Sequence, residues 1–562
     1  MEVLGISTSE QKVTVTPLGG VGEIGKNMFA IECGDDMLVL DCGLAFPEDD
    51  LPGIDIVLPD MGYVFERKNR LRGILLTHGH EDHIGGMPYL LKEASAPVYG
   101  SSLTLGMVEG KLAEHALRLP AGSRPLRDGE RLTLGCFQVE DFHVTHSVPG
   151  ARGYAIRTPV GVLVFTGDFK FDLTPVDGEV TDFQMLTRLG REGVQCLFCD
   201  STNAERPGFT GSERQVGGTI ARLVAEAPGR VLLTTFASNV HRLQQVFDTA
   251  TAVGRRVAIV GRSMEKNAEI AAKLGYLRIA DGVLLPTEAI GRMPPEKVII
   301  LTTGSQGEPM SALSRMATGE HRAVELVPGD TVVLAATPVP GNEKSFHRTI
   351  DNLFRLGVHV IYQREAGVHV SGHGSREELK LMMTLLRPRW FIPVHGEYRH
   401  LVLNGRMAVE TGVPEDHVLL GENGSVFEFT PERSRIAGRV PAGRVLVDGL
   451  GVGDVGNVVM RDRRQLAQDG IVVVSMCVRK ETAELVGTPE IASRGFVYVR
   501  ESEDLMEEVR TRVTEAVNGG RGRRRGGGDV NALRGQVREN VGQFLWDRTH
   551  RRPVILPLIV EI

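Results

Sequence analysis

Residues 77–83 read THGHEDH and directly follow the apolar run 74–76. Three histidines and one aspartate therefore fall within six positions at the end of an expected strand. A solvated loop has no reason to collect three imidazoles, and a packed core would have to desolvate them at a cost in free energy. Neutral imidazoles and carboxylates are good ligands for divalent zinc or manganese. The run therefore predicts a metal site, and a chance histidine-rich turn is the weaker alternative.

In extended or turning backbone, His78 and His80 project to the same side and can share one metal. The Asp-His pair that ends the run then turns toward a second metal. Four residues cannot fill two coordination spheres, so further ligands are expected at later strand ends. The candidates that follow later apolar runs are His146, Asp168 and His395. His143 competes with His146, but residues three apart face opposite sides of a strand, so only one of them should point at the metals.

Short apolar runs that end in a polar residue or glycine recur along the chain and indicate buried strands. They occupy residues 38–41, 74–78, 162–168, 231–235, 298–304, 332–337 and 391–395. Amphipathic helical stretches, such as 241–252 and 377–386, lie between several of them. This alternation predicts α/β layers, in which chemistry collects at the carboxyl ends of the strands.

A second motif, SGHGS, occupies residues 371–375. Ser375 and Glu378 fit a capping box, with Ser375 as the N-cap residue of a helix and Glu378 at its third position. The motif would then be a glycine-bearing loop that enters a helix N-terminus. Such a loop offers free backbone N–H groups to an anion.

Two other patterns have simpler explanations. Residues 20–25, GVGEIG, match a dinucleotide-binding fingerprint, but that motif requires a following helix and residues 27–32 read as a strand. We therefore predict a glycine hairpin there. Cys196 and Cys199 have the spacing of a metal or redox pair, but they lie in a strand and face opposite sides, so two buried thiols are expected. Asp200 could support the metal site or cap its strand.

The His-x-His-x-Asp-His run, followed by a lone histidine and a lone aspartate, resembles the metallo-β-lactamase superfamily. The SGHGS motif and the PVHGE motif at 393–397 resemble motifs of the β-CASP nucleases. Longer stretches, at residues 18–26, 236–239, 302–310 and 340–343, are similar to the bacterial ribonuclease J family. The resemblance covers nearly the whole chain and is weakest over the Arg/Gly-rich residues 519–528. Those residues read as a solvated loop, with a nucleic-acid contact as the alternative.

The resemblance implies an α/β fold: a metallo-β-lactamase αββα sandwich with an inserted α/β β-CASP domain and a small α+β C-terminal domain. The sandwich would comprise residues 1–209 and 373–435, and the β-CASP domain residues 210–372. The Gly-, Pro- and Arg-rich residues 436–465 would form a linker, and residues 466–562 an oligomerisation domain.

The resemblance also implies roles for individual residues. His78, His80 and His146 would hold one metal, Asp82, His83 and His395 the other, and Asp168 would bridge both. Asp41 would support the ligands, and Asp82, Asp168 and His373 would be catalytic. His373 would assist the leaving group, with a plain phosphate contact as the alternative. The residues expected to cradle an RNA phosphate are Ser238, Asn239, Ser371, Gly372, His373, Gly374 and Ser375.

The expected function is hydrolysis of RNA by water activated by two divalent metals, zinc or alternatively manganese. The resemblance implies 5′-to-3′ exonuclease activity on single-stranded 5′-monophosphate RNA, and endonuclease activity, in rRNA processing and mRNA decay. It also implies a homodimer or homotetramer and RNA-decay partner proteins. The rival hypotheses are another hydrolase on the same core, such as a DNA nuclease or thioester hydrolase, and a non-catalytic RNA-binding scaffold.

The composition of the 562-residue chain is compatible with this function but does not require it. A net charge of −7 does not indicate a nucleic-acid binder, although bound cations can attract phosphate to an acidic protein. No apolar run is long enough to span a membrane, and no signal peptide is expected. The six scattered cysteines favour the reducing cytoplasm.

Overall fold

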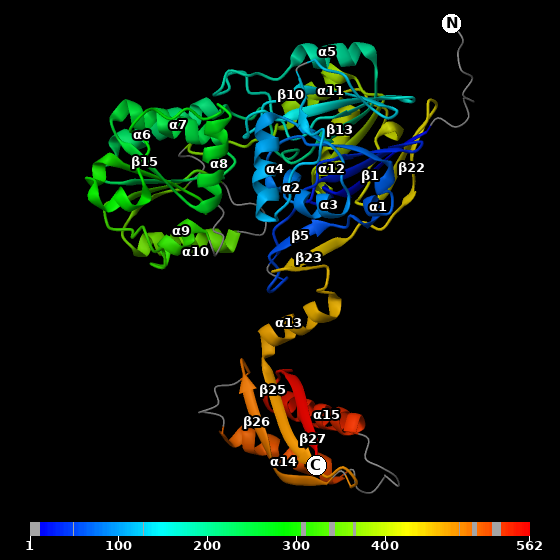
Figure 1. Ribbon diagram of the computed structural model, residues 1–562, viewed down its shortest axis with the longest axis vertical. Coiled ribbons are helices and arrows are strands. Elements are labelled where there is room, and N and C mark those ends of the chain that lie inside the picture. Colours follow the sequence, from blue (N-terminus) through cyan, green and yellow to red (C-terminus); the bar gives the residue numbers. More distant parts are fainter. Residues whose placement is uncertain are drawn as a thin grey trace. The chain divides into compact units, whose positions relative to one another are not determined.

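The computed structural model describes residues 12–562 except 49, 128, 305–310, 337–342, 363–366, 483, 497–502 and 520–529. The chain divides into two compact units (Figure 1). The main unit comprises Met1–Ala45 and Val57–Val445, and the C-terminal unit comprises Phe46–Ile56 and Leu446–Ile562. Among the described residues, no helix is both long enough and apolar enough to cross a membrane.

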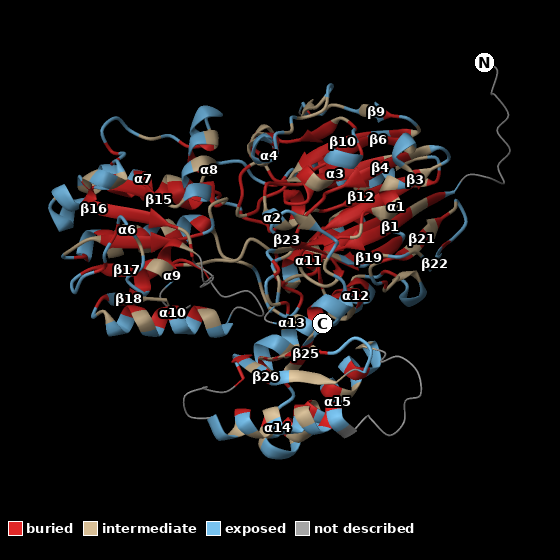
Figure 2. Ribbon diagram, turned by 60° about the horizontal axis from the view of Figure 1, so that its bottom comes forward, coloured by how far each residue is buried: buried red, intermediate tan, exposed pale blue. Residues whose placement is uncertain are grey.

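Two sheets form the centre of the main unit. The first sheet has the order β22 (Ser434–Arg439), β21 (Ser425–Phe429), β1 (Val13–Gly19), β3 (Met28–Cys33), β4 (Asp36–Leu40), β6 (Leu71–Leu75), β7 (Val98–Gly100) and β8 (Arg124–Pro125). The second sheet has the order β19 (Trp390–Val394), β13 (Val194–Asp200), β12 (Gly161–Phe165), β11 (Arg152–Thr158), β10 (Phe137–His143) and β9 (Leu132–Leu134). The strands of both sheets are largely buried (Figure 2). Their apolar faces share one core, to which Leu38, Tyr154 and Phe198 contribute fully buried side chains.

Helices complete the sandwich. The second sheet packs against α5 (Phe183–Glu192), α11 (Arg376–Leu386) and α12 (Tyr398–Glu410) through a core that includes Leu189, Met383 and Met407. The helices that accompany the first sheet are α1 (Gly62–Phe65), α2 (Glu81–Ile84), α3 (Met87–Glu93) and α4 (Ser102–Glu114). The result is the αββα arrangement that the sequence predicts.

A separate lobe, here called the inserted lobe (residues 213–361), lies between β13 and β19 in the chain. Its five strands are all parallel, in the order β15 (Arg256–Val260), β16 (Val298–Thr302), β14 (Val231–Thr234), β17 (Thr331–Leu334) and β18 (His359–Ile361). A parallel sheet needs cover on both faces. One face carries α6 (Glu213–Glu226), α7 (Val240–Val253) and α8 (Arg262–Lys273), and the other carries α9 (Ala312–Ala317) and α10 (Glu343–Arg355) (Figure 1).

The predicted strands are confirmed, with ends that differ by a few residues: β4, β6, β12, β14, β16, β17 and β19 occupy the seven apolar runs. The predicted helices at 241–252 and 377–386 are α7 and α11. The expected linker at 436–465 instead has regular structure. Strand β22 continues to Arg439, and β23 (Arg444–Asp448), β24 (Gly451–Val452) and α13 (Asn457–Asp469) follow. Two arginines of this stretch pair with carboxylates: Arg439 lies 2.9 Å from Glu422, and Arg463 contacts Asp448.

The C-terminal unit has a sheet of order β26 (Leu485–Arg494), β25 (Ile471–Val478) and β27 (Val554–Glu561). It packs on α14 (Glu503–Gly519) and α15 (Val530–Thr549). The sequence pattern also predicts strands at 472–476, 495–499 and 554–560. The first and third are confirmed as parts of β25 and β27, whereas β26 ends at Arg494 and residues 497–499 lie outside the described part. The arginines at 521–525 also lie outside it. The remaining short strands are β2 (Val21–Gly22), β5 (Ile56–Pro59) and β20 (Gly396–Glu397).

Candidate metal centre

The predicted ligands converge at one edge of the sandwich. Residues 77–83 follow β6 and enter α2, His146 lies shortly after β10, Asp168 shortly after β12 and His395 directly after β19. All are carboxyl ends of strands, where an α/β sheet presents its polar side chains. Each of these ligands except His80 and Asp82 is at least nine-tenths buried.

The first group of ligands consists of His78, His80, His146 and Asp168. His80 Nδ1 lies 2.9 Å from His78 Nε2 and 3.1 Å from His146 Nε2. Asp168 Oδ2 lies 3.6 Å from His78 Nε2 and 3.9 Å from His146 Nε2. Three ring nitrogens and one carboxylate oxygen thus face a common point.

The second group consists of Asp82, His83, His395 and again Asp168. Asp82 Oδ2 lies 3.2 Å from His395 Nε2 and 3.6 Å from His83 Nε2. Asp168 Oδ2 lies 3.3 Å from His83 Nε2 and 3.7 Å from His395 Nε2. Asp168 is therefore shared by the two groups, as expected of a carboxylate placed between two cations.

Hydrogen bonds on the far side of the rings fix their orientation. His83 Nδ1 donates to Asp41 Oδ2 at 2.7 Å, and His146 Nδ1 donates to the carbonyl oxygen of Gly372 at 2.7 Å. His395 Nδ1 lies 2.6 Å from the hydroxyl of Thr202. Because these Nδ1 atoms are engaged, the three Nε2 atoms face Asp168. Partners of this kind orient metal-binding histidines in other proteins.

Two residues of the centre have left-handed backbone conformations. Asp41 has φ 57° and His395 has φ 53°, values that cost a residue other than glycine about 1–3 kcal/mol. Strain of this kind persists where the surroundings require one side-chain position. Here the strained backbone directs the Asp41 carboxylate onto His83 and the His395 ring onto Asp82.

Protonation also differs between the groups. Burial lowers the pKa of His80 to about 4 and holds the pKa of His78 and His146 well below the ordinary value. Burial opposes charge on His395 too, but the carboxylates of Asp168, Asp200 and Asp82 outweigh it and raise its pKa to about 10. The three histidines of the first group are thus neutral, the form that binds a cation. In the second group, His395 holds a proton that a divalent cation would displace.

The donor set fits a pair of divalent cations. Imidazole nitrogens and carboxylate oxygens suit zinc and also manganese. The donor atoms within each group lie within 4.8 Å of one another, which is close enough to surround one ion. His78, His80 and His146 would hold one cation, Asp82, His83 and His395 the other, and Asp168 both.

A third cluster adjoins these groups and joins His373 to Asp200. His373 Nδ1 donates to Asp200 Oδ2 at 2.8 Å, while His373 Nε2 lies 3.9 Å from Asp168 Oδ2. Asp200 itself is 1% exposed and ends β13. The sequence left its role open; the structure gives it a direct contact with His373, and the Asp200 carboxylate, together with Asp168, outweighs burial and raises the pKa of that histidine.

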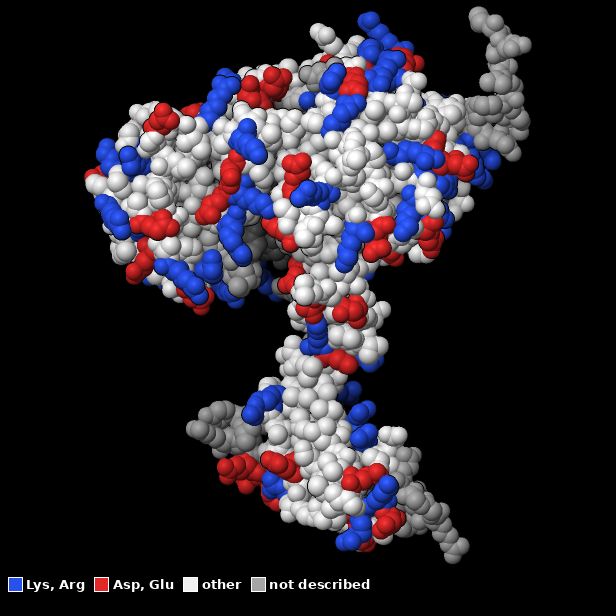
Figure 3. All heavy atoms as spheres, in the orientation of Figure 1, with Lys and Arg blue, Asp and Glu red and all other residues white. Residues whose placement is uncertain are grey.

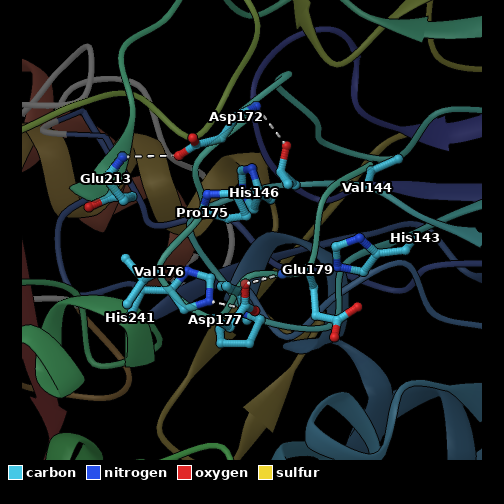
Figure 4. Close-up of a pocket in the computed structure, with 13 residues that line it drawn as sticks. His143, Val144, His146, Asp172, Pro175, Val176, Asp177, Glu179, Glu213 and His241 are labelled. Carbon is cyan, nitrogen blue, oxygen red and sulfur yellow. Dashed lines mark hydrogen bonds and ion pairs between the residues drawn. The ribbon is translucent and has the colours of Figure 1, made fainter. Parts of the chain in front are cut away.

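His143 does not join the ligands, as the strand spacing predicts. Its Nδ1 lies 3.0 Å from the carbonyl oxygen of Val180. It lines a cavity of about 10 Å³ beside His146, with Asp177, Glu179 and His241 (Figure 4). That volume holds about one water molecule.

The loop at 371–375 is less open than expected. The N–H of His373 donates to Ser371 Oγ (3.2 Å), that of Gly374 to the Phe169 carbonyl (2.6 Å) and that of Ser375 to Glu378 Oε2 (2.7 Å). The capping box at Ser375 is confirmed, but the expectation of free N–H groups is wrong at these three positions. Gly372 has a different use: a Cβ there would lie 2.6 Å from His146 Cε1, so glycine lets the loop approach that ring.

The other two candidate phosphate contacts lie at the start of α7 in the inserted lobe. Asn239 is its N-cap residue and its Oδ1 accepts the N–H of Arg242 at 3.0 Å. Ser238 precedes it and is partly exposed. Asn239 therefore starts the helix, and Ser238 is the more accessible of the two.

Sequence reasoning missed three supporting residues. The amide of Asn27 donates to the Asp82 carbonyl at 3.1 Å, and the hydroxyl of Thr202 contacts His395. The amide of Asn203 donates to the carbonyl of His373 at 2.8 Å. Thr202 and Asn203 lie shortly after the end of β13, which pairs with both β12 and β19. Their position at this strand end is the sequence signal that could have identified them. The GVGEIG segment forms β2 without a following helix, as expected, and the Gly20 carbonyl accepts the N–H of His395 at 2.7 Å.

The sandwich, the inserted lobe and the histidine-aspartate centre define a metallo-β-lactamase-type metallohydrolase with a β-CASP domain. The metallo-β-lactamase superfamily model matches residues 21–237, and the model described as "Zn-dependent metallo-hydrolase RNA specificity domain" matches residues 357–414. The models "Ribonuclease J, beta-CASP domain" and "Ribonuclease J C-terminal domain" match residues 228–353 and 458–562. The chain belongs to the ribonuclease J family.

Full-length relatives support this assignment. The chain is 42% identical to Ribonuclease J 1 of Streptococcus pyogenes serotype M3, over 99% of both chains. It is 43% identical to Ribonuclease J2 of Bacillus subtilis strain 168, over 98% of this chain and 99% of that protein. A solved structure, a protein of unknown function from Enterococcus faecalis V583, has a TM-score of 0.51 at 16% identity and covers 74% of this chain and 99% of its own. That likeness concerns the fold alone.

Proposed function

We propose that this protein is a metal-dependent ribonuclease that hydrolyses RNA phosphodiester bonds with water. The observation that carries the proposal is the position of Asp168, whose Oδ2 lies within 4 Å of ring nitrogens from both ligand groups. Two divalent cations, zinc or alternatively manganese, would lower the pKa of water and neutralise charge on the phosphate. Relatives named ribonuclease J support RNA as the substrate.

The protein's own groups hold and orient this centre. Asp41, Gly372 and Thr202 fix the rings of His83, His146 and His395, so that little reorganisation accompanies the reaction. The Asp82 carboxylate contacts His395, and the side-chain amide of Asn27 donates to the backbone carbonyl of Asp82.

His373 is the proposed proton donor to the departing 3′-oxygen. Its Nδ1 is engaged by Asp200, so its Nε2 faces the centre and carries the transferable proton. Departure of the 3′-oxygen leaves the phosphate on the 5′ side of the product. The downstream product then begins with a 5′-monophosphate, and the upstream product ends in a 3′-hydroxyl.

Replacing His373 with alanine should lower kcat for RNA by about 10²- to 10⁴-fold, the usual worth of a positioned proton donor. Asp200→Asn should lower it in the same direction, because the ring loses its ionic partner. Bound metal, measured by elemental analysis, should stay at the wild-type level in both variants. His359→Ala, an exposed histidine of the inserted lobe, is the control. A His373→Ala variant with a wild-type rate would leave this residue as a plain phosphate contact.

We also propose stepwise 5′-to-3′ degradation together with internal cleavage. Ser238, at the start of α7, and the 371–375 loop are the candidate contacts of a 5′-monophosphate, which suits a helix N-terminus. On the face seen in Figure 3, basic and acidic side chains are mixed. No basic patch stands out on that face, so we assign recognition of the RNA end to these local contacts.

RNA with a 5′-triphosphate should be trimmed from that end about 10-fold more slowly than 5′-monophosphate RNA, because a pocket for one phosphate leaves two further charges without partners. Release of 5′-labelled mononucleotide measures this rate. Ser238→Ala should reduce the preference, whereas cleavage at internal sites of a circular RNA should not change. Equal trimming of both ends would contradict the pocket. A DNA strand of the same sequence tests the DNA-nuclease alternative, and binding without cleavage would indicate the scaffold alternative.

We further propose a homodimer or homotetramer through the C-terminal unit, and location in the cytoplasm with RNA-decay partner proteins. Leu556, Leu558 and Val560 on β27 are 41–55% exposed, which leaves apolar surface for a second copy. Light scattering of the full-length protein measures the oligomer. The six cysteines are free thiols, which suits a reducing compartment.

A further inference from the structure

Helix α4 contacts the metal-binding loop through Met107. Met107 is 3% exposed, and a Cβ added to Gly79 would overlap its sulfur. Gly79 lies between the ligands His78 and His80, so the backbone of the loop rests directly on this side chain. A side chain at this position would require the Met107 thioether to move.

A second contact, one helical turn further along α4, touches the same loop. Lys111 Nζ lies 2.5 Å from both carboxylate oxygens of Glu81. Glu81 lies between His80 and Asp82. Helix α4 therefore contacts Gly79 and Glu81, the two residues of the loop that lie between His78 and His80 and between His80 and Asp82.

Helix α4 also packs against α8 of the inserted lobe (Figures 1 and 2). A Cβ added to Gly106 would lie 2.9 Å from both Ile270 Cγ2 and Leu274 Cδ1, and one added to Gly110 would lie 2.9 Å from Lys266 Cε. Two glycines one turn apart thus allow the two helices to approach closely.

Polar contacts fix the relative position of the two helices. Lys266 Nζ donates to the Gly110 carbonyl at 2.5 Å and lies 2.6 Å from Glu114 Oε1. At the other end of α4, a Cβ added to Gly150 would lie 2.9 Å from the N-cap hydroxyl of Ser101 and 3.6 Å from Tyr276 Oη. Gly150 belongs to the loop that follows His146.

We propose that α4 is a positioning element through which the inserted lobe sets the geometry of the metal-binding loop. On one side of α4, Gly106 and Gly110 contact α8. Met107 and Lys111 of the same helix contact Gly79 and Glu81 of the loop. Close-packed groups transmit displacement because no void absorbs it. The consequence for RNA hydrolysis rests on the proposed function, whereas the consequence for metal binding does not.

The test places a wedge between α4 and α8. Gly106→Leu keeps a good helix former but requires Ile270 and Leu274 to move. It should lower kcat for RNA by about 10-fold or more while KM changes little, because small misplacements of reacting groups are costly. Bound metal should pass to a chelator about 10-fold more readily, as when the support of a ligand is disturbed. Met107→Ala, on the other side of α4, should reproduce both effects.

Gly218→Leu is the matched control, because Gly218 lies in α6 with no atom near its added Cβ. It should keep wild-type kcat and metal retention. If Gly106→Leu does not fold, Gly106→Ala applies the same displacement on a smaller scale and should show a smaller change in the same direction. Folded Gly106 variants with wild-type kcat and metal retention would overturn the proposal. A wild-type protein that binds metal but cleaves no RNA would refute the proposed function, and the chelator measurements would still test α4.

Discussion

Asp168→Asn should eliminate RNA hydrolysis and most of the bound metal. Asparagine keeps the shape of the side chain but removes the charge that both ligand groups share. Its oxygen would still face His83 and His395, but a neutral amide is a poor ligand for a divalent cation. Loss of metal catalysis removes several kcal/mol of transition-state stabilisation, so kcat/KM should fall by at least about 10³-fold.

Metal analysis beside the rate measurement separates this explanation from others. Asp168→Asn should hold less than one metal ion per chain, whereas His80→Ala, which removes a ligand of the first group only, should retain the ion of the second group more fully. Asp281→Asn, an exposed aspartate of the inserted lobe, should match the wild type in both measurements. An Asp168→Asn protein with two tightly bound ions and a normal rate would refute the shared carboxylate.

Glu213→Ala should destabilise the inserted lobe by about 3–5 kcal/mol. Glu213 Oε2 lies 2.7 Å from Arg242 Nη2, and the two side chains are 2% and 0% exposed. Arg242 also donates to the carbonyls of Ala335 and Val368. These carbonyls remain in the variant, but the buried guanidinium loses the carboxylate that balances its charge. Urea denaturation followed by circular dichroism measures the loss as a lower midpoint.

The same helix offers a matched control. Arg222 and Glu226 form an exposed pair at 3.1 Å on α6, and Arg222→Ala should cost at most about 1 kcal/mol. The double variant Glu213→Leu with Arg242→Met should recover much of the stability lost in Glu213→Ala, since it removes both buried charges. A Glu213→Ala protein as stable as Arg222→Ala would mean that the buried guanidinium finds another partner.

The sequence was sufficient for the features that depend on local pattern. Apolar runs located the strands, and polar residues at their ends located the candidate ligands, because the carboxyl ends of neighbouring strands meet at one edge. The two-residue repeat of a strand also separated His146 from His143. The resemblance to a known family supplied the assignment of His146, Asp168 and His395 to the two groups.

Features that depend on distant contacts could not be read in this way. Asp200 and His373 are 173 positions apart, and neither sequence neighbourhood indicates the other. The N–H of Gly374 looked free because its partner, the carbonyl of Phe169, lies in another segment. The arginines near residue 436 suggested a linker because their carboxylate partners lie on a neighbouring strand.

The place of the inserted lobe in the chain has a consequence for how the centre is assembled during synthesis. The four ligands of the first group all precede the lobe, whereas His395 of the second group follows it. Strand β19 pairs with β13 in parallel, with Val394 beside Asp200, so the chain must return from the lobe to the strand it left before His395 can reach Asp168. A nascent chain therefore contains all four residues of the first group before the lobe is synthesised. The second group is complete only after the lobe has been synthesised and β19 has paired with β13, which brings His395 to Asp168.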